Sequence, residues 1–175
     1  ERSADHKLLP VLFLSRARYA NPPDPTSEKK WRGLAPLLQS TIISFGNGSS
    51  FQKVTFAGSC LVLLPSGIPR LLRYGLHFIC SFFYALHGAL RGTYRAIIAQ
   101  SPYEALAPAL ALLPWKLFRS TAKPRLIVEV HSDWGSGAML YHHYSSFAWL
   151  EKPLRKLVGS TSLSQADAYR VISEY

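Results

Sequence analysis

Cysteine is scarce in this chain, and the spacings typical of metal sites are missing. The 175 residues include two cysteines, Cys60 and Cys80, and both stand in apolar surroundings. There is no C-x-x-C pair and no Cys/His spacing typical of zinc sites. His142-His143 has no carboxylate or third ligand at a useful distance in sequence, which favours an acceptor-contacting loop or plain surface over a metal site. We therefore expect free, buried thiols in a reducing compartment and no bound metal.

The short motifs of several enzyme classes are also absent. The sequence has no P-loop, no G-x-S-x-G, no H-E-x-x-H and no D-x-D. Gly46-Asn47-Gly48 begins like a dinucleotide fingerprint, but Phe51 stands at the third glycine position and no helix clearly follows. These absences predict no resident cofactor, and they remove the usual carboxylate clamp for a metal-bound nucleotide diphosphate.

Acidic residues are few, and the longest uncharged run is a little short for a membrane span. Ten Asp and Glu stand against 20 Lys and Arg, a formal net charge of +10. This excess favours anionic partners such as nucleic acid, phosphate-bearing ligands or an acidic membrane surface. No Lys/Arg run exceeds two and none is interleaved densely with aromatics, so nucleic acid is disfavoured. The absence of a signal peptide predicts a cytoplasmic protein, with peripheral attachment to the cytoplasmic membrane face as an option.

What is present is an alternation of strand and helix patterns typical of one α/β domain. We expect a Rossmann-like parallel sheet flanked by helices and joined by right-handed crossovers. The first residues, 1–6, are predicted to be a disordered end. Strands are predicted at 8–14, 41–45, 53–56, 60–64, 96–100, from 125, and at 168–172, and helices from Ser27 as N-cap towards residue 38, at 69–91, at 101–113 and at 152–164.

The segment 69–91 has the period of an amphipathic helix. Its apolar positions recur at three and four, and we expect this face to pack on the sheet; they are Leu72, Leu76, Ile79, Phe83, Leu86 and Leu90. A transmembrane span is the competing interpretation, but the uncharged run is a little short and contains two histidines. Arg70, Arg73 and Arg91 share the opposite face and suggest an anionic membrane surface or a phosphate-linked lipid acceptor.

Two places where a strand ends carry the candidate site residues. After 96–100, Ser101 can cap a helix or hold a ligand, and Glu104 can complete a capping box or project into a cleft. The strand from Arg125 ends in His131-Ser132-Asp133-Trp134, where a histidine can donate a hydrogen bond and an indole can stack on a sugar or base. A structural histidine beside a covering tryptophan is the alternative. Glu129 shares a strand face with His131 and can orient it.

Four segments occur in an order that resembles the N-terminal half of a family 4 glycosyltransferase of the GT-B type. They are Val11–Leu14, Ile97–Glu104, Val128–Trp134 and Ala166–Tyr175, and the resemblance covers the chain from about Lys7 to its end. It implies an acceptor-binding domain that faces a nucleotide-sugar-binding domain across a cleft, with retaining, metal-independent transfer to a saccharide or lipid-linked acceptor. A non-catalytic Rossmann-like module that binds nucleotides or nucleic acid is the rival interpretation.

The resemblance also assigns residues. His131 matches a strand-end histidine that faces the transferring sugar, and Ser173 matches a serine beside the interdomain linker. Asp133 and Trp134 are expected to border the acceptor, with Ser101, Glu104 and Arg16 in the cleft. Ser15–Tyr19 replaces the family's glycine-rich turn, which leaves the contact there open. No two glutamates stand seven residues apart as in the donor domain, so we expect that domain to be absent and this chain to be inactive alone.

Overall fold

The chain forms a seven-stranded sheet between two helical layers. The computed structural model describes residues 8–118, 122–131 and 148–172. The strands stand in the order β3-β4-β2-β1-β5-β6-β7. Their bounds are β1 Leu9–Tyr19, β2 Leu38–Gly46, β3 Gln52–Phe56, β4 Ser59–Leu64, β5 Ala96–Ala99, β6 Arg125–His131 and β7 Ala168–Ile172, and the helices are α1 Pro25–Leu34, α2 Arg70–Arg91, α3 Leu106–Ala111, α4 Leu113–Leu117 and α5 Ala148–Gln165.

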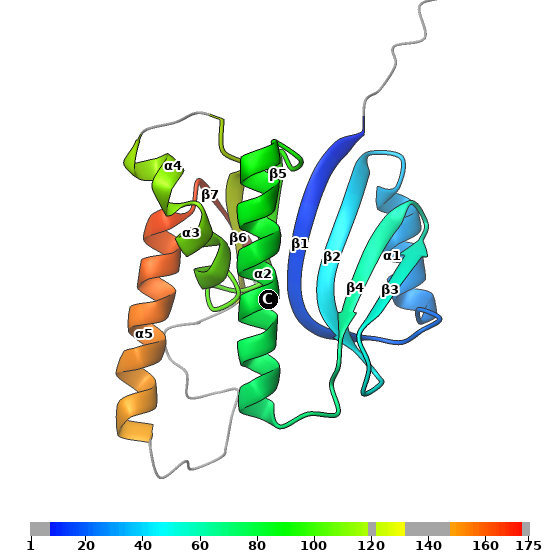
Figure 1. Ribbon diagram of the computed structural model, residues 1–175, viewed down its shortest axis with the longest axis horizontal. Coiled ribbons are helices and arrows are strands. Elements are labelled where there is room, and N and C mark those ends of the chain that lie inside the picture. Colours follow the sequence, from blue (N-terminus) through cyan, green and yellow to red (C-terminus); the bar gives the residue numbers. More distant parts are fainter. Residues whose placement is uncertain (1–7, 119–121, 132–147, 173–175) are drawn as a thin grey trace, which may run out of the picture.

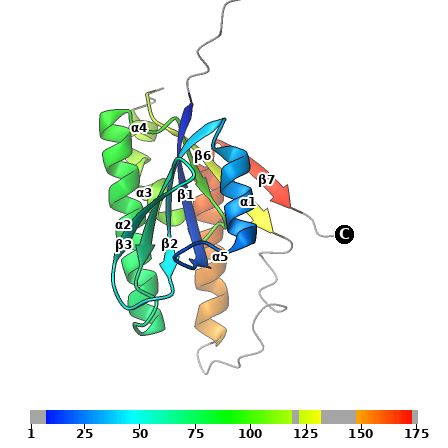
Figure 2. The same cartoon turned by 90° about the vertical axis from the view of Figure 1, so that its right-hand side faces the viewer.

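All strand pairs are parallel except the β3–β4 hairpin at one edge of the sheet. Helices α2, α3, α4 and α5 lie on one face, and α1 lies on the other (Figures 1 and 2). The predicted fold class is therefore confirmed as a Rossmann-like α/β sheet flanked by helices. The crossover helices impose the parallel arrangement, since each strand must return to the same end of the sheet before the next begins.

Alternate residues of β1 divide the core into two clusters, one on each face of the sheet. Leu12 and Leu14 are fully buried towards α2 and α3. Val11 and Phe13 point to the opposite face, where Trp31 of α1 packs edge-on against the Phe13 ring at 5.1 Å between centroids. Because both faces are buried, β1 has a continuous apolar run rather than an alternating one.

Two element ends differ from the sequence prediction. The N-cap of α1 is Asp24, whose carboxylate accepts hydrogen bonds from the backbone N–H groups of Thr26 and Ser27, so Ser27 as N-cap is wrong. A carboxylate is at least as good a cap as a hydroxyl, and it also favours the positive end of the helix dipole. The helix ends at Leu34, and β1 continues through the segment that was expected to replace a glycine-rich turn.

The orientation of α2 is the largest correction. The residues that face the sheet are small or polar: His77, Ser81, Ala85, Gly88 and Ala89. The large apolar residues that were expected to pack there are mostly on the outside, with Leu72, Ile79, Phe83 and Leu90 all more than half exposed. Close approach of the helix to the sheet and to Tyr94 leaves room only for small side chains, and His77 keeps a backbone hydrogen bond in the interior.

Gly88 and Gly75 provide a matched test of this close approach. A Cβ atom on Gly88 would lie 2.2 Å from Cδ2 of Tyr94, whereas a Cβ atom on Gly75 would meet nothing within 4 Å. Gly88→Ala is therefore expected to lower the free energy of unfolding by about 1–2 kcal/mol, since overpacking outweighs helix propensity. Gly75→Ala is expected to raise it by about 0.5–1 kcal/mol. Urea unfolding followed by circular dichroism measures the stability of both variants. Equal stabilisation of the two would show that the Tyr94 ring moves aside without cost.

Three further sequence predictions concern the solvent and membrane environment. Both cysteines are free, as expected, but each is only partly buried. Within the described ranges, no helix is both long enough and apolar enough to cross a bilayer. Residues 1–6, predicted to be a disordered end, lie outside the described part of the chain.

Candidate functional site

The carboxyl ends of three neighbouring strands meet at one edge of the sheet. Leu14 of β1 pairs with Ala99 of β5, and Ala99 pairs with Val128 of β6. Residues that follow these positions therefore reach the same edge, including Arg16 on β1 and His131 at the end of β6. Ligand sites of open α/β sheets form at this edge, because loops there diverge and leave a crevice.

Arg16 and Glu104 form an ion pair at this edge, although 88 residues separate them in sequence. Nε of Arg16 donates to Oε1 of Glu104 over 2.5 Å. The Glu104 side chain is 5% exposed and that of Arg16 is 35% exposed. The second carboxylate oxygen, Oε2, is buried and has no hydrogen-bond partner among the described residues. A buried carboxylate oxygen without a donor is costly, so this oxygen calls for an explanation.

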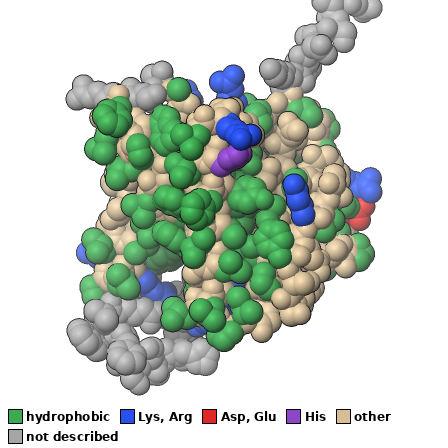
Figure 3. Space-filling model, in the orientation of Figure 1, with side chains coloured by type: hydrophobic (Ala, Val, Ile, Leu, Met, Phe, Trp, Pro, Cys, Tyr) green, Lys and Arg blue, Asp and Glu red, His purple; other side chains and the backbone are tan. Residues whose placement is uncertain are grey.

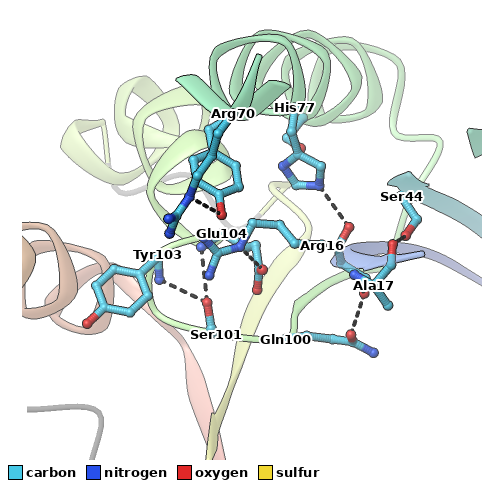
Figure 4. Close-up of polar contacts among 12 residues, drawn as sticks. Arg16, Ala17, Ser44, Arg70, His77, Gln100, Ser101, Tyr103 and Glu104 are labelled. Carbon is cyan, nitrogen blue, oxygen red and sulfur yellow. Dashed lines mark hydrogen bonds and ion pairs between the residues drawn. The ribbon is translucent and has the colours of Figure 1, made fainter. Parts of the chain in front are cut away.

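Ser101 positions Glu104 by capping the turn that precedes α3. The Ser101 hydroxyl oxygen accepts weak hydrogen bonds from the backbone N–H groups of Tyr103 and Glu104, at 3.3 and 3.4 Å. Ser101 as the N-cap of a helix is therefore wrong: residues 101–105 form turns, α3 begins at Leu106, and its N-cap is Ala105 without a side-chain hydrogen bond. Glu104 makes no capping box. It projects towards Arg16 instead (Figure 4).

A cavity of about 330 Å³ opens beside this ion pair. Arginines and aromatic rings dominate its walls. The guanidinium of Arg16 lies 5.3 Å from the ring centre of Tyr74, and that of Arg73 lies 5.6 Å from the ring centre of Phe45. Planar guanidinium groups held on aromatic faces suit phosphate, carboxylate and sugar hydroxyl groups. The lining residues are Arg16, Ala17, Arg18, Phe45, Arg73, Tyr74, Gln100, Ser101 and Glu104.

The positive charge around the cavity lowers the pKa of the Tyr74 phenol. Partial burial by itself would raise the pKa of Tyr74. The hydrogen bond that Arg70 donates to the phenol oxygen, together with the charges of Arg70, Arg16 and Arg73, outweighs burial and lowers this pKa. An anionic group that entered the cavity would gain from the same positive potential.

A buried hydrogen-bond network fixes the end of β1 beneath the cavity. The Ser15 hydroxyl donates to Oε1 of Gln100 over 2.5 Å and accepts from the backbone N–H of Ala17 at 3.0 Å. The Ser44 hydroxyl donates to the carbonyl of Ala17, and Nε2 of His77 donates to the carbonyl of Ser15 at 3.0 Å (Figure 4). The network holds the Arg16 backbone from both neighbouring strands and from α2, so the guanidinium starts from a rigid base.

His77 makes this support sensitive to acid. His77 is 4% exposed, and burial, only partly offset by the charge of Glu104, holds its pKa below the ordinary value of 6.5. Below pH 6.5, His77 therefore binds a proton in the unfolded chain but stays neutral in the folded chain until the pH is lower. We expect this group to lower the free energy of unfolding as the pH falls from 6.5, by up to about 1.4 kcal/mol per pH unit.

His77→Gln removes this titration while keeping a donor towards the carbonyl of Ser15. The difference between the pH–stability curves of the wild type and His77→Gln, measured by urea unfolding, is expected to grow below pH 6.5. Parallel curves from pH 7 to pH 5 would contradict it, because the other histidines titrate in both proteins.

The remaining predicted site residues divide into two groups. Glu129 is 8% exposed and accepts a hydrogen bond from Arg170 of β7 at 3.1 Å, so its described partner is an arginine of the neighbouring strand. His131 ends β6 at the site edge, opposite Ile172 in the pairing with β7, and its side chain lies outside what the structure describes. Asp133, Trp134, Ser173 and the His142-His143 pair also lie outside the described residues, so their predicted roles stay predictions.

Sequence reasoning missed Gln100, Tyr74 and His77 as parts of the site. Gln100 follows β5 directly, and its position at the end of a strand could have identified it as a candidate site residue. Tyr74 and His77 lie on α2, whose large apolar residues were expected to pack on the sheet. The observed orientation of α2 instead brings Tyr74 to the cavity wall and His77 to the supporting network. Across the described residues, no group of three or more His, Cys, Asp or Glu side chains is arranged to hold a metal ion.

Comparison with known proteins finds a solved structure with a similar fold. The sequence matches no known family and no curated protein. Its fold is similar to that of a sucrose-phosphate synthase from Thermosynechococcus elongatus, with a TM-score of 0.54 over 92% of this chain and 16% sequence identity. The chain corresponds to 41% of the length of that protein. At this identity the likeness concerns the fold alone.

Proposed function

We propose that this chain is the acceptor-side domain of a retaining, metal-independent glycosyltransferase. One observation carries the proposal: Glu104 lines the cavity, and its carboxylate has one oxygen paired to Arg16 and a second, buried oxygen without a hydrogen-bond partner among the described residues. A saccharide acceptor presents hydroxyl groups, and Oε2 of Glu104 would accept a hydrogen bond from one of them. The sequence resemblance supports the family and the retaining mechanism, and the structural relative supports the fold on which they depend.

The arginines define the acceptor further. Arg16, Arg18 and Arg73 line the cavity, whose one carboxylate is already paired. A neutral sugar hydroxyl needs no such excess of positive charge, whereas a phosphate group gains from it through bidentate hydrogen bonds. We therefore propose an acceptor in which a saccharide or lipid carries a phosphate group. The donor is a nucleotide-sugar held by a second domain across the cleft, in line with the lack of a dinucleotide fingerprint here.

Glycosyl transfer by a protein that joins this domain to a donor-binding domain tests the proposal. A panel of radiolabelled nucleotide-sugars, incubated with phosphorylated and unphosphorylated acceptors, is expected to yield product only with the joined protein. The 175-residue chain by itself is expected to bind phosphorylated acceptor, as seen in ligand-observed NMR, without turnover. Full turnover by the isolated chain would contradict the division of labour. Tight nucleotide binding without transfer in either protein would favour a non-catalytic module.

A further inference from the structure

The outer side of α2 carries a straight apolar stripe that no described residue covers. Leu72, Ile79, Phe83 and Leu90 are spaced by seven, four and seven residues, which places them along one line of the helix. They are 63%, 52%, 60% and 68% exposed. With a rise of 1.5 Å per residue the stripe is about 27 Å long.

Further exposed apolar side chains stand near the end of α4, on the same side of the sheet as α2. Leu117 and Phe118, at the end of α4, are 71% and 84% exposed. Figure 3 shows hydrophobic side chains gathered over the face formed by α2, α3 and α4, in the same orientation as Figure 1. Contiguous apolar patches of this kind mark a docking surface rather than ordinary solvent-exposed protein. We name it the α2 face.

Charges around the α2 face have one sign. The sequence contains no Asp or Glu between Glu28 and Glu104, so β2 to β5, including all of α2, are free of acidic side chains. Arg70 and Arg73 stand at the amino end of α2, and Arg91 stands at its carboxyl end. Figure 3 shows basic side chains beside the apolar patch and acidic ones only at the far rim.

We propose that the α2 face docks on the surface of a bilayer that contains anionic lipid. A stripe of leucine, isoleucine and phenylalanine flanked by arginines is the pattern of a helix that lies in the membrane interface, with its apolar side below the headgroups and its cations among them. The helix lies along the surface and does not cross it. The inference rests on exposure and charge, independently of the proposed enzymatic function.

A second copy of the chain fits the α2 face less well. A two-fold axis perpendicular to α2 would bring Arg70 of one copy against Arg91 of the other, and an axis along the helix would pair each arginine with itself. Neither arrangement offers a carboxylate to compensate the repulsion, because the face has none. An anionic lipid headgroup supplies the missing charge.

Docking would also bring the acceptor cavity close to the membrane. Arg73 and Tyr74 belong to α2 and line the cavity beside Arg16 and Glu104. One helix therefore connects the lipid-facing stripe with the proposed acceptor site.

Vesicle flotation of the 175-residue chain tests the proposal. The wild type is expected to float with vesicles of phosphatidylcholine mixed with phosphatidylglycerol and to remain at the bottom with phosphatidylcholine alone. The double variant Ile79→Ser/Phe83→Ser is expected to lose binding by at least about tenfold. Arg91→Gln is expected to lose about fivefold, and more salt in the buffer should reduce this difference.

Phe51→Ser is the matched control, because Phe51 is 55% exposed and precedes β3, outside the α2 face. It is expected to float like the wild type. Circular dichroism melts confirm that each variant is folded, since all the replaced side chains are exposed. Absence of flotation, equal flotation with both lipid mixtures, or equal loss in Phe51→Ser would overturn the proposal. So would sedimentation as a dimer that Ile79→Ser/Phe83→Ser dissociates, since a second copy would then cover the face.

Discussion

Replacing Arg16 with alanine is expected to lower the free energy of unfolding by about 2 kcal/mol. The change leaves the 5%-exposed carboxylate of Glu104 buried without the guanidinium that now donates to it. Breaking a fully buried pair costs about 3–5 kcal/mol, and we expect less here because a third of the Arg16 side chain already reaches water. Urea unfolding at pH 7 measures the effect.

Two further variants separate the ion pair from its surroundings. Arg16→Ala/Glu104→Gln is expected to recover more than half of the lost stability, because it removes the stranded charge together with its partner. Arg18→Ala is the matched control, since Arg18 is exposed, lies two residues further along β1 and lines the same cavity. It is expected to change stability by less than about 0.5 kcal/mol. Equal losses in Arg16→Ala and Arg18→Ala would show that the Glu104 pair stabilises nothing.

Replacing His131 with alanine is expected to reduce turnover about 10²- to 10³-fold in a protein that joins this domain to a donor-binding domain. His131 ends β6 at the edge where Arg16 and Ser101 stand, and the sequence resemblance gives it a hydrogen bond to the transferring sugar. A donor that acts mainly in the transition state contributes to kcat more than to KM.

A purely structural His131 would behave differently. The variant would then lose stability while the folded fraction retained near wild-type turnover. Measuring kcat, KM and the melting temperature of the same preparation separates the two roles. Glu129→Gln serves as a reference on the same strand, because Glu129 accepts a hydrogen bond from Arg170 and contributes nothing to the cavity walls. We expect its turnover to remain within a few-fold of the wild type.

The positions of the strands were largely predictable from the sequence. β6 begins at Arg125, and β7 spans Ala168–Ile172, both as predicted. β6 is buried along most of its length, whereas β7 is an exposed edge strand that its strand-forming residues alone identified. Strands β3 and β4 were predicted, but their antiparallel pairing, the continuation of β1 to Tyr19 and the Asp24 cap were missed. In each case the local sequence is compatible with more than one conformation or pairing. Contacts with neighbouring elements select one of them.

For the candidate site, the sequence identified residues and the tertiary structure decided their pairing. Ser101, Glu104 and Arg16 were named as cleft residues, and all three line one cavity. No spacing rule could join Arg16 to Glu104 across 88 residues, since β1 and the turn after β5 meet only when β5 pairs with β1.

By itself, the sequence determined an α/β domain with parallel strands, because its periods alternate between buried strand and amphipathic helix and its connections are long enough for crossovers. It also determined an excess of positive charge and a strand-end position for His131. Only the tertiary structure decided which side of α2 is inside. A helical pattern shows that two faces differ, but the width of the gap at Gly88 and Tyr94, where a single Cβ atom would collide, determines which face fits.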